Sequence, residues 1–343
     1  MRLSFKGVLI ASPLILILAY ADACLAARAA LYRDSRVIMG TLCEVQVYDT
    51  SAVRAKDAIG AALDEMARVD RLLSNYNPAS ELSRMNQEAS KGPFHASAEL
   101  FNFVTASRQF YNDTEGTFDP TMGALVRAWG FFSRHPGLPN ADQIAAGKLA
   151  TGFDKVQIDP GERTIRYAVS GLEMDPGGIG KGYAADQATE VLRRFGIHAA
   201  LVSAGGSSIS AIGHPPGQRA WRIAISNPAN QSKAVAVVEL RDTSLSTSGV
   251  SRQALESGPH TYSHIFDPRT GEPVENMCQV TVVTQKGTAA EALSKAAFIL
   301  SREDLASVLR RYPGSHVLRL EGSCASNSVW VTQRSESVIR RSN

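Results

Sequence analysis

The sequence predicts a mixed α+β fold, because strand and helix patterns occur without the regular β–α–β alternation of a doubly wound parallel sheet. Residues 36–48 alternate apolar and polar side chains, as a strand does, whereas residues 52–73 carry apolar side chains at helical spacing. Strand patterns dominate the second half of the chain, at 209–213, 220–226, 234–241 and 278–284. A Rossmann domain is therefore not expected.

The remaining segments follow the same two patterns. Further helices are predicted at 97–111, 181–195, 288–300 and 302–311. Further strands are predicted at 198–202, 315–320 and 328–332. After the first helix we expect a polar loop, SNYNPASELSRMNQ (residues 74–87), and Gly and Pro interrupt the regular patterns again within residues 112–131.

Composition limits the class of protein. The 343 residues suit one large domain or two closely packed ones, and 44% hydrophobic residues allow a sizeable core. The formal net charge of +3 is too small to indicate a nucleic-acid binder, and no stretch alternates basic clusters with aromatic residues. We therefore expect no nucleic-acid partner.

Residues 1–26 are predicted to be a secretory signal peptide. Arg2 and Lys6 precede a short apolar run at residues 7–21, and small residues follow it. A membrane anchor is the alternative, but the run is short for a helix that spans a bilayer. The protein is therefore expected to be exported to the periplasm.

The end of this segment leaves two processing routes open. Ala21-Asp22-Ala23 is an A-x-A-like cleavage site, so that cleavage is expected after Ala23 or Ala26. Cys24 directly follows Ala23, and a lipid on Cys24 is the alternative. Contact with a membrane is expected only through such an anchor or through the protein's partner.

The cysteines match no CxxC metal or redox motif. They are Cys24, Cys43, Cys278 and Cys324. If Cys24 is removed or lipidated, three remain, which excludes a complete disulfide framework. One bridge is possible in an oxidising compartment.

The stretch DPGGIGKGYAADQ (Asp175–Gln187) has four glycines within six residues, just before a helical pattern. Glycine-rich turns at helix starts often hold phosphates. The stretch is not a P-loop, because Gly182 stands where Ser or Thr should follow the lysine, and it is not part of a βαβ unit. A tight turn that packs a helix close to a sheet is the alternative.

Residues 175–186 are similar to the D-x-G-G-I-A-K-G-Y-A-x-D signature of the ApbE-type FAD:protein FMN transferases. Other stretches that resemble this family occur along the chain in the family's order. They are Met39-Gly40-Thr41, Ser74-Asn75-Tyr76, Ser80-Glu81-Leu82-Ser83, FDPTMG (118–123), Trp129-Gly130-Phe131, LVSAGG (201–206), STSG (246–249) and YSHIFDPRTG (262–271). Any one of these is weak, but together they cover most of the chain.

The resemblance implies a single α+β domain over residues 36–335. In this fold, mixed or antiparallel sheets and flanking helices form two lobes, and FAD lies in the cleft between them. The family binds FAD and magnesium and moves FMN onto a threonine hydroxyl of a target protein, here an acceptor redox protein, with release of AMP. Phosphoryl chemistry of this kind needs charge relief on the pyrophosphate and a base for the hydroxyl.

The resemblance also implies roles for individual residues. His264 would activate the threonine, for which its ordinary pKa is suited, and Asp267 would orient His264 or hold a turn. The expected FAD contacts are Met39, Tyr76, Trp129, Gly130, Phe131, Asp175, Lys181 and Phe266. A structural histidine, core packing of Met39 and the buried aromatic residues, and a solvated Lys181 are the alternatives.

The sequence departs from the family at the metal site, where the resemblance implies Gly178 (through its carbonyl), Glu291 and Ser294 as magnesium ligands. Glu291 replaces an aspartate, and Lys295 replaces a threonine that would be a ligand. An ammonium group cannot coordinate magnesium. Lys295 turns away from the metal, or it occupies the metal's position, or catalysis is lost and flavin binding is kept. A further alternative is that Glu291 and Lys295 form an i,i+4 ion pair on an exposed helix face.

Three functions therefore remain open. The first is an exported transferase that flavinylates a periplasmic or membrane-associated redox protein. The second is a non-catalytic FAD-binding protein of the same fold. The third is an FAD pyrophosphatase, in which water replaces the threonine and the products are FMN and AMP.

Overall fold

The computed structural model describes residues 28–130, 138–250, 254–257, 260–333 and 335–342. An antiparallel sheet of eight strands runs through the molecule, in the order β1-β2-β6-β7-β10-β15-β16-β17. Its strands are β1 (Ala30–Ile38), β2 (Thr41–Asp49), β6 (Ala200–Ala204), β7 (Ser208–Ile212), β10 (Ser244–Gly249), β15 (Met277–Thr284), β16 (His316–Gly322) and β17 (Asn327–Val331).

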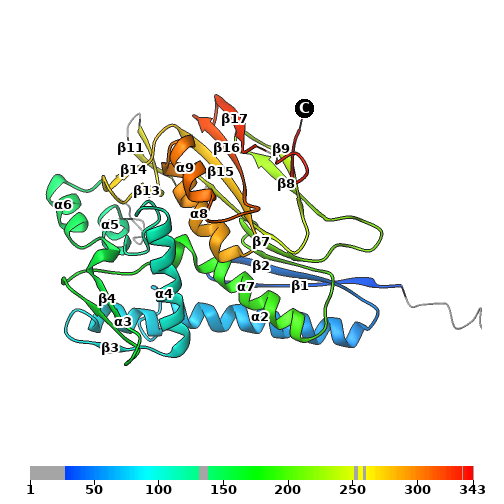
Figure 1. Cartoon of the computed structure of the whole chain (residues 1–343), viewed down its shortest axis with the longest axis horizontal. Helices are drawn as coiled ribbons and strands as arrows, with labels where there is room; N and C mark the ends of the chain where they lie inside the picture. The colour runs from blue at the N-terminus through cyan, green and yellow to red at the C-terminus, as the bar shows by residue number, and fades with distance from the viewer. Residues whose placement is uncertain (1–27, 131–137, 251–253, 258–259, 334, 343) are drawn as a thin grey trace, which may run out of the picture.

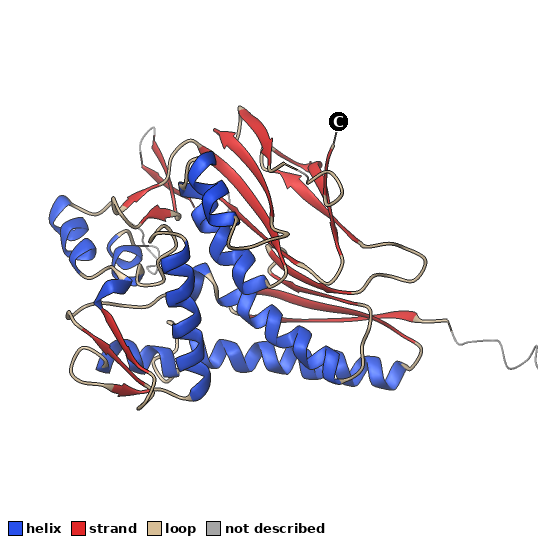
Figure 2. Ribbon diagram, in the orientation of Figure 1, coloured by secondary structure: helices blue, strands red, loops and turns tan. Residues whose placement is uncertain are grey.

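Helices pack on one face of this sheet (Figures 1 and 2). They are α2 (Ala52–Leu73), α7 (Gly180–Arg194), α8 (Gly287–Ile299) and α9 (Arg302–Leu309). Leu63 and Met66 of α2 are fully buried in one core with Val45 of β2 and Ala184 of α7. The amphipathic pattern that predicts α2 therefore decides which of its faces meets the sheet.

A smaller sheet covers part of the opposite face. It contains β8 (Trp221–Asn227), β9 (Asn230–Leu240) and β18 (Ile339–Arg341), in the order β18-β9-β8. Trp221 and Val238 pack with Leu201 of β6 in a second core. In the same core, a disulfide joins Cys278 of β15 to Cys324 in the loop between β16 and β17. This is the one bridge that the cysteine count allowed.

A group of helices and short strands lies at one end of the molecule, at the left in Figure 1. It contains α3 (Glu81–Glu88), α4 (Ala98–Asp113), α5 (Gly123–Ala128), α6 (Ala141–Leu149) and a sheet of β3 (Phe94–His95), β5 (Thr164–Tyr167) and β4 (Val156–Asp159). Short elements complete the fold: η1 (Phe153–Lys155), η2 (Pro176–Gly178), and the hairpins β11 (Ala254–Ser257) with β12 (His260–Ser263) and β13 (Phe266–Asp267) with β14 (Glu272–Pro273).

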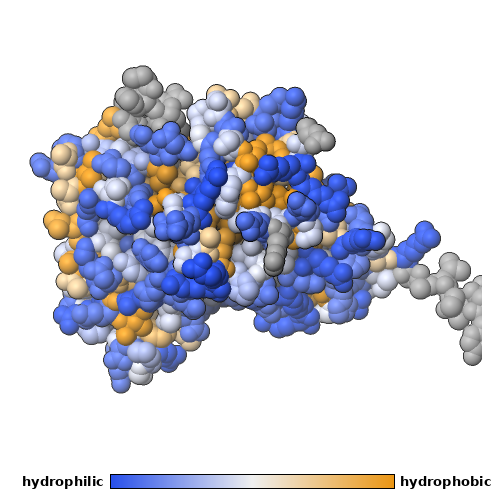
Figure 3. Space-filling model, turned by 45° about the horizontal axis from the view of Figure 1, so that its top comes forward, coloured by the Kyte–Doolittle hydropathy of each residue, from blue (hydrophilic) through white to orange (hydrophobic). Residues whose placement is uncertain are grey.

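The surface is mainly polar on the face drawn in Figure 3. Hydrophilic residues cover most of this face, and apolar residues lie between them in separate areas. Within the described residues, no helix is long and apolar enough to cross a membrane.

The α+β class is confirmed, and the predicted helices and most predicted strands fall within a few residues of the observed ones. The single strand predicted at 36–48 is wrong. Met39 and Gly40 adopt φ of +54° and +67°, and they form a two-residue turn that separates β1 from β2. Alternation continues on both sides of such a turn, so the pattern alone does not reveal it.

The polar loop predicted at 74–87 is also wrong in its second half, which forms α3. The hydroxyl of Ser80 caps this helix by accepting the Ser83 backbone N–H at 2.9 Å. Glu81 in the first turn favours the same helix start electrostatically.

Helices α7 and α8 cross with almost no space between their backbones. A Cβ added to Gly182 of α7 would lie 2.2 Å from the carbonyl oxygen of Gly287 at the start of α8. Asp186, one turn further along α7, accepts the backbone N–H groups of Gly287 (2.7 Å) and Thr288 (2.9 Å) and so caps α8. Gly182 therefore allows α7 to pack closely against α8, while α7 also packs on the sheet.

The substitution Gly182→Ala should lower the free energy of unfolding by about 1–3 kcal/mol, because the two helices must separate to admit the methyl group. Urea unfolding followed by circular dichroism measures this. Gly60→Ala in the interior of α2 is the control, since nothing lies within 4 Å of its added Cβ. That change should stabilise by about 0.5–1 kcal/mol. Equal stability of Gly182→Ala and the wild type would contradict the crossing.

Candidate active site

A cavity of about 940 Å³ lies where the helical end of the molecule meets the main sheet. This volume is near the upper end for ligand pockets, so the cavity suits a large ligand such as a dinucleotide. Its wall is built from residues far apart in the sequence: the turn at 39–41, the end of α2 with the loop at 73–76, residues within 117–126 and 175–181, the loop after β6, the end of β10, residues 264–266 and 268, and α8.

Met39, Tyr76 and Phe266, three of the expected FAD contacts, line this cavity. The hairpin turn brings Met39 there, and the Met39 backbone N–H donates to the Asp70 carboxylate of α2 at 3.0 Å. Tyr76 follows the end of α2 and is 77% exposed, so a large part of its ring is open to a ligand. Phe266 is buried beside the cavity.

The glycine-rich stretch forms the start of α7 at the cavity. The Asp175 carboxylate accepts the Gly177 N–H at 2.9 Å and holds the turn of η2, and burial raises the pKa of Asp175. Helix α7 has no side-chain cap, and Gly180 and Lys181 in its first turn line the cavity. The positive end of a helix dipole and an ammonium group therefore face the same space, which favours an anionic ligand.

Glu291 of α8 is buried beneath the start of α7, with only 1% of its surface exposed. Its carboxylate lies 3.0 Å from the Lys181 ammonium and accepts the Gly182 N–H at 2.6 Å. Burial alone would raise the pKa of Glu291, but Lys181, Lys295 and the Gly182 N–H together outweigh burial and lower it. Glu291 is therefore a charged group whose two oxygens are already bonded.

Lys295 lies one turn further along α8, and it points into the same region. Its ammonium donates to the hydroxyl of Ser248 at 2.9 Å and lies 3.5 Å from the hydroxyl of Ser294. Burial lowers the pKa of Lys295 to about 8. The exposed i,i+4 pair of Glu291 and Lys295 is wrong as an interpretation, because Glu291 is buried and forms its ion pair with Lys181 instead.

The magnesium ligands implied by the resemblance do not fit a divalent cation in this arrangement. Glu291 is occupied by Lys181 and Gly182. Ser294 is fully buried, and its hydroxyl donates to the Glu291 carbonyl at 2.7 Å and bonds Ser248 at 2.7 Å. Gly178 lines the cavity, but the stem of Lys295 passes beside it. Among the residues that the structure describes, no group of three or more His, Cys, Asp and Glu side chains could hold a metal.

The two expected catalytic residues have different surroundings. His264 lies between β12 and β13, half-buried, and lines the cavity. The Asp267 carboxylate accepts the Arg269 backbone N–H at 3.0 Å and pairs with the Arg269 guanidinium at 2.6 Å. Despite burial, these bonds lower the pKa of Asp267. Asp267 is not part of the lining of this cavity. Its contacts therefore favour the role of holding a turn over that of orienting His264.

The segment Trp129-Gly130-Phe131 lies behind the cavity wall as far as the structure describes it. Trp129 is 3% exposed and packs against Phe266, with ring centroids 5.6 Å apart. Gly130 follows it with φ of +74° just after the end of α5. Phe131 lies outside the described residues. Neither Trp129 nor Gly130 is part of the cavity lining, but Trp129 packs against Phe266, which does line the cavity. Their contact with FAD stays a prediction.

Several lining residues received no role from the sequence. Asn75, Asp119 and Ser248 belong to stretches that resemble the family, yet motif matching alone does not indicate what they contact. Asp119 is 8% exposed, and burial raises its pKa to about 6 despite hydrogen bonds from the Thr121 backbone N–H (2.8 Å) and hydroxyl (2.6 Å). The Asp-Pro-Thr sequence could have indicated this local turn.

The titration of Asp119 should be visible in the stability of the protein. Its pKa in the fold lies above the ordinary value of 3.8, so the stability it contributes is present at low pH and is lost as the pH rises through 6. Asp119→Asn removes this loss. From pH 4 to pH 7.5, its free energy of unfolding relative to the wild type should therefore rise by roughly 2 kcal/mol. Asp57→Asn, at an exposed carboxyl of α2, is the control. A difference that does not change with pH would contradict the burial of a charge at Asp119.

Comparisons with known proteins agree with the fold and the motifs. The model of the ApbE family matches residues 39–318. The chain is 34% identical over 279 residues to an FAD:protein FMN transferase of Salmonella typhimurium, covering 80% of this chain and 79% of that protein. It is 30% identical over 307 residues to the FAD:protein FMN transferase of Escherichia coli K12, covering 88% and 87%.

Solved structures lead to the same conclusion. An ApbE protein from Thermotoga maritima superposes with a TM-score of 0.82 at 25% identity, covering 91% of this chain and 100% of that one. The apo form of the Pseudomonas stutzeri flavinyl transferase ApbE superposes with a TM-score of 0.79 at 27% identity, covering 91% and 97%. The family model, the sequence relatives and the solved structures agree, and the chain belongs to the ApbE family.

Proposed function

We propose that this chain transfers the FMN half of FAD to a hydroxyl group of an acceptor protein and releases AMP. The observation that carries the proposal is the cavity: it has the size for a dinucleotide, and two lysines and a helix start lie together on its wall. The family relatives named FAD:protein FMN transferase support the same reaction. FAD is therefore the substrate as well as the bound flavin.

The reaction exchanges one bond to phosphorus for another. The acceptor oxygen attacks the phosphorus on the FMN side of the pyrophosphate, and the bond from that phosphorus to the bridging oxygen breaks. AMP leaves with the bridging oxygen and the bonding electrons, and the hydroxyl proton is given up to a base. Positive groups near the bridging oxygen stabilise the charge that develops on AMP.

His264 is the residue that we assign as the base for the acceptor hydroxyl. It lines the cavity, and neutral imidazole accepts a proton near neutral pH. The acceptor hydroxyl is that of a threonine in a redox protein, as the family resemblance implies. The exposed ring of Tyr76 at the cavity supports an entry that a protein segment can reach.

A magnesium ion has no part in this proposal. Two of the residues implied to hold it, Glu291 and Ser294, bond to each other, and each also contacts a lysine. Every step of the transfer therefore uses groups of the chain itself.

Purified protein that lacks residues 1–26, incubated with FAD and a threonine-bearing acceptor domain, should release AMP and increase the acceptor mass by that of FMN. AMP without a change in acceptor mass would instead indicate hydrolysis of FAD by water. Bound FAD that stays intact with several acceptors would indicate a flavin-binding protein and would overturn the transferase.

His264→Gln should lower the rate of FMN transfer by about 10²–10⁴-fold, because it removes the base and keeps a side chain of polar character. The affinity for FAD should change little, since the base acts on the acceptor. Stopped-flow measurement of AMP release and fluorescence titration of FAD measure the two effects separately. A large loss of FAD affinity with an unchanged rate would contradict the assignment of His264 as the base.

We also propose that the protein is exported to the periplasm. The signal-like segment at 1–26 supports export, and so does the disulfide between Cys278 and Cys324, because such bonds persist in oxidising compartments. Cys43 is a buried free thiol and is left out of this pairing.

The intact mass of the protein isolated from a bacterial envelope tests export and processing together. A mature chain that begins after Ala23 or Ala26 is expected, with two fewer hydrogens for the disulfide. A diacylated Cys24 at the N-terminus would support export with a lipid anchor. A reduced, unprocessed chain in the cytoplasm would overturn the proposal.

A further inference from the structure

The start of α7 and one turn of α8 together bring two ammonium groups and one carboxylate to the cavity wall. Lys181 and Glu291 form a close pair at 3.0 Å, and the second oxygen of Glu291 is bonded to the Gly182 N–H. Lys295 makes no ion pair within 4 Å in the described part of the chain. The three side chains thus carry one net positive charge.

The hydrogen bonds of Lys295 leave room for a ligand. An ammonium group has three N–H donors, and the hydroxyls of Ser248 and Ser294 accept from it at 2.9 and 3.5 Å. Both acceptors are neutral, and Lys295 lines the cavity while Ser294 is fully buried behind it. At least one donor of Lys295 is therefore available to a ligand.

A partly buried cation without a direct ion pair, as Lys295 is, weakens the apo protein, because an ion pair does not offset the desolvation of its charge. A ligand that brings a negative oxygen to Lys295 removes this penalty. The pyrophosphate of a dinucleotide carries such oxygens and needs charge relief when its bridging bond breaks. Geometry and charge thus indicate the same ligand chemistry.

We propose that Lys295 binds a pyrophosphate oxygen of FAD directly, in the place where the family resemblance implies magnesium, so that this chain binds FAD and transfers FMN without a divalent metal. The inference rests on the proposed function. In the transfer step, the Lys295 ammonium stays protonated and faces the AMP phosphate, which leaves with the bridging oxygen. Lys181 keeps Glu291 occupied, so that this carboxylate does not compete for Lys295.

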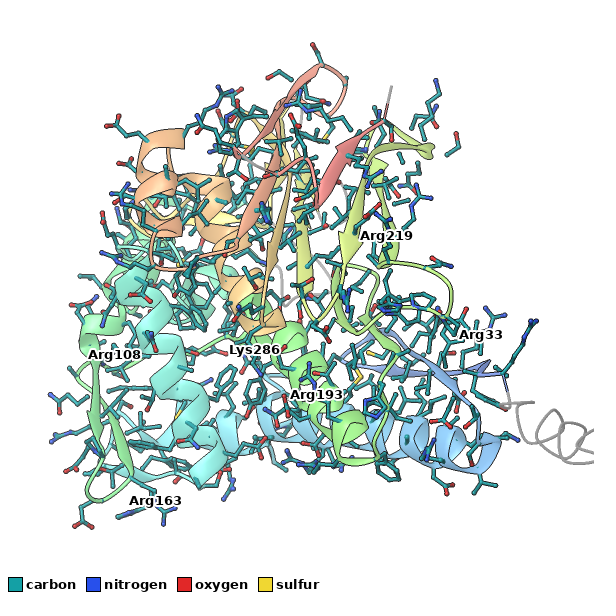
Figure 4. All side chains as sticks on the ribbon, turned by 45° about the vertical axis from the view of Figure 1, so that its right-hand side comes forward. Arg33, Arg108, Arg163, Arg193, Arg219 and Lys286 are labelled. Carbon is teal, nitrogen blue, oxygen red and sulfur yellow. A yellow bond between two sulfur atoms is a disulfide. The ribbon has the colours of Figure 1, made fainter. Side chains whose placement is uncertain are left out.

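Three substitutions separate charge from size at this position. Lys295→Met removes the charge and keeps the length of the stem, Lys295→Arg keeps the charge, and Lys295→Thr supplies a hydroxyl ligand for a metal. Lys286→Met is the matched control: Lys286 immediately precedes α8, is exposed on the surface in Figure 4, and lies 3.4 Å from Glu190, away from the cavity. Each variant is measured for FAD affinity, AMP release and thermal stability, with EDTA and with magnesium.

The wild type should bind FAD and release AMP equally well with EDTA and with magnesium. Lys295→Met should weaken FAD binding about ten- to hundred-fold, as loss of a charge-assisted hydrogen bond does. Its apo form should melt at the same or a higher temperature, because a partly buried charge without a direct ion pair is gone. Lys295→Arg should keep most of the affinity, and Lys286→Met should match the wild type. Lys295→Thr should weaken FAD binding as Lys295→Met does, with or without magnesium, because Glu291 stays bonded to Lys181 and Gly182.

Two results would overturn the inference. One is a wild type that loses AMP release in EDTA and regains it with magnesium. The other is a Lys295→Met variant that binds FAD as tightly as the wild type. Metal-independent FAD binding that Lys295→Met weakens, without AMP release in any condition, would support the lysine site and would contradict only the transferase. Failure of the wild type to bind FAD would contradict both.

Discussion

The buried carboxylate of Glu291 is the interaction on which the candidate site depends. It accepts the Gly182 N–H of α7 from its own position in α8, so that one side chain joins the two helices at their crossing. The absence of a side chain at Gly182 permits this contact, and the Asp186 cap on α8 holds the same crossing from its other end. These contacts hold the start of α7 against α8, and both helices form part of the cavity wall.

This crossing also determines where the charges lie. Glu291 uses both oxygens on α7, one for Gly182 and one for Lys181. Because the carboxylate is engaged in this way, it forms no direct ion pair with Lys295, which bonds to the hydroxyls of Ser248 and Ser294 instead. Glu291 is already bonded to Lys181 and Gly182, so the second ammonium group, that of Lys295, leaves the cavity wall with a net positive charge. An anionic dinucleotide complements this arrangement better than a divalent cation does.

The sequence predicts much of the architecture because long amphipathic patterns identify helices well, and the bounds predicted for α2 are the observed ones. It does not predict the turn at Met39 and Gly40, because methionine is not a residue that favours positive φ, and alternation continues across the turn. The start of α3 is not predicted either, because a polar sequence around Ser80 suits a loop and a capped helix equally well.

The sequence predicts site residues only where a family motif assigns a role to a position. Met39, Tyr76, Lys181 and His264 do line one cavity. The state of Lys295 is not predictable, because the spacing from Glu291 suits an exposed pair as well as a buried site. The nearly all-apolar composition of α8 favours burial, but Ser248 is remote in the sequence, and only the fold brings it to Lys295.

Diffraction from crystals of the FAD complex grown with manganese tests the central claim most directly, because manganese substitutes for magnesium and scatters anomalously. The account predicts a pyrophosphate oxygen within about 2.7–3.2 Å of the Lys295 ammonium and no anomalous peak between Glu291 and Ser294. A manganese peak at that position, with Lys295 turned away from the pyrophosphate, would contradict it.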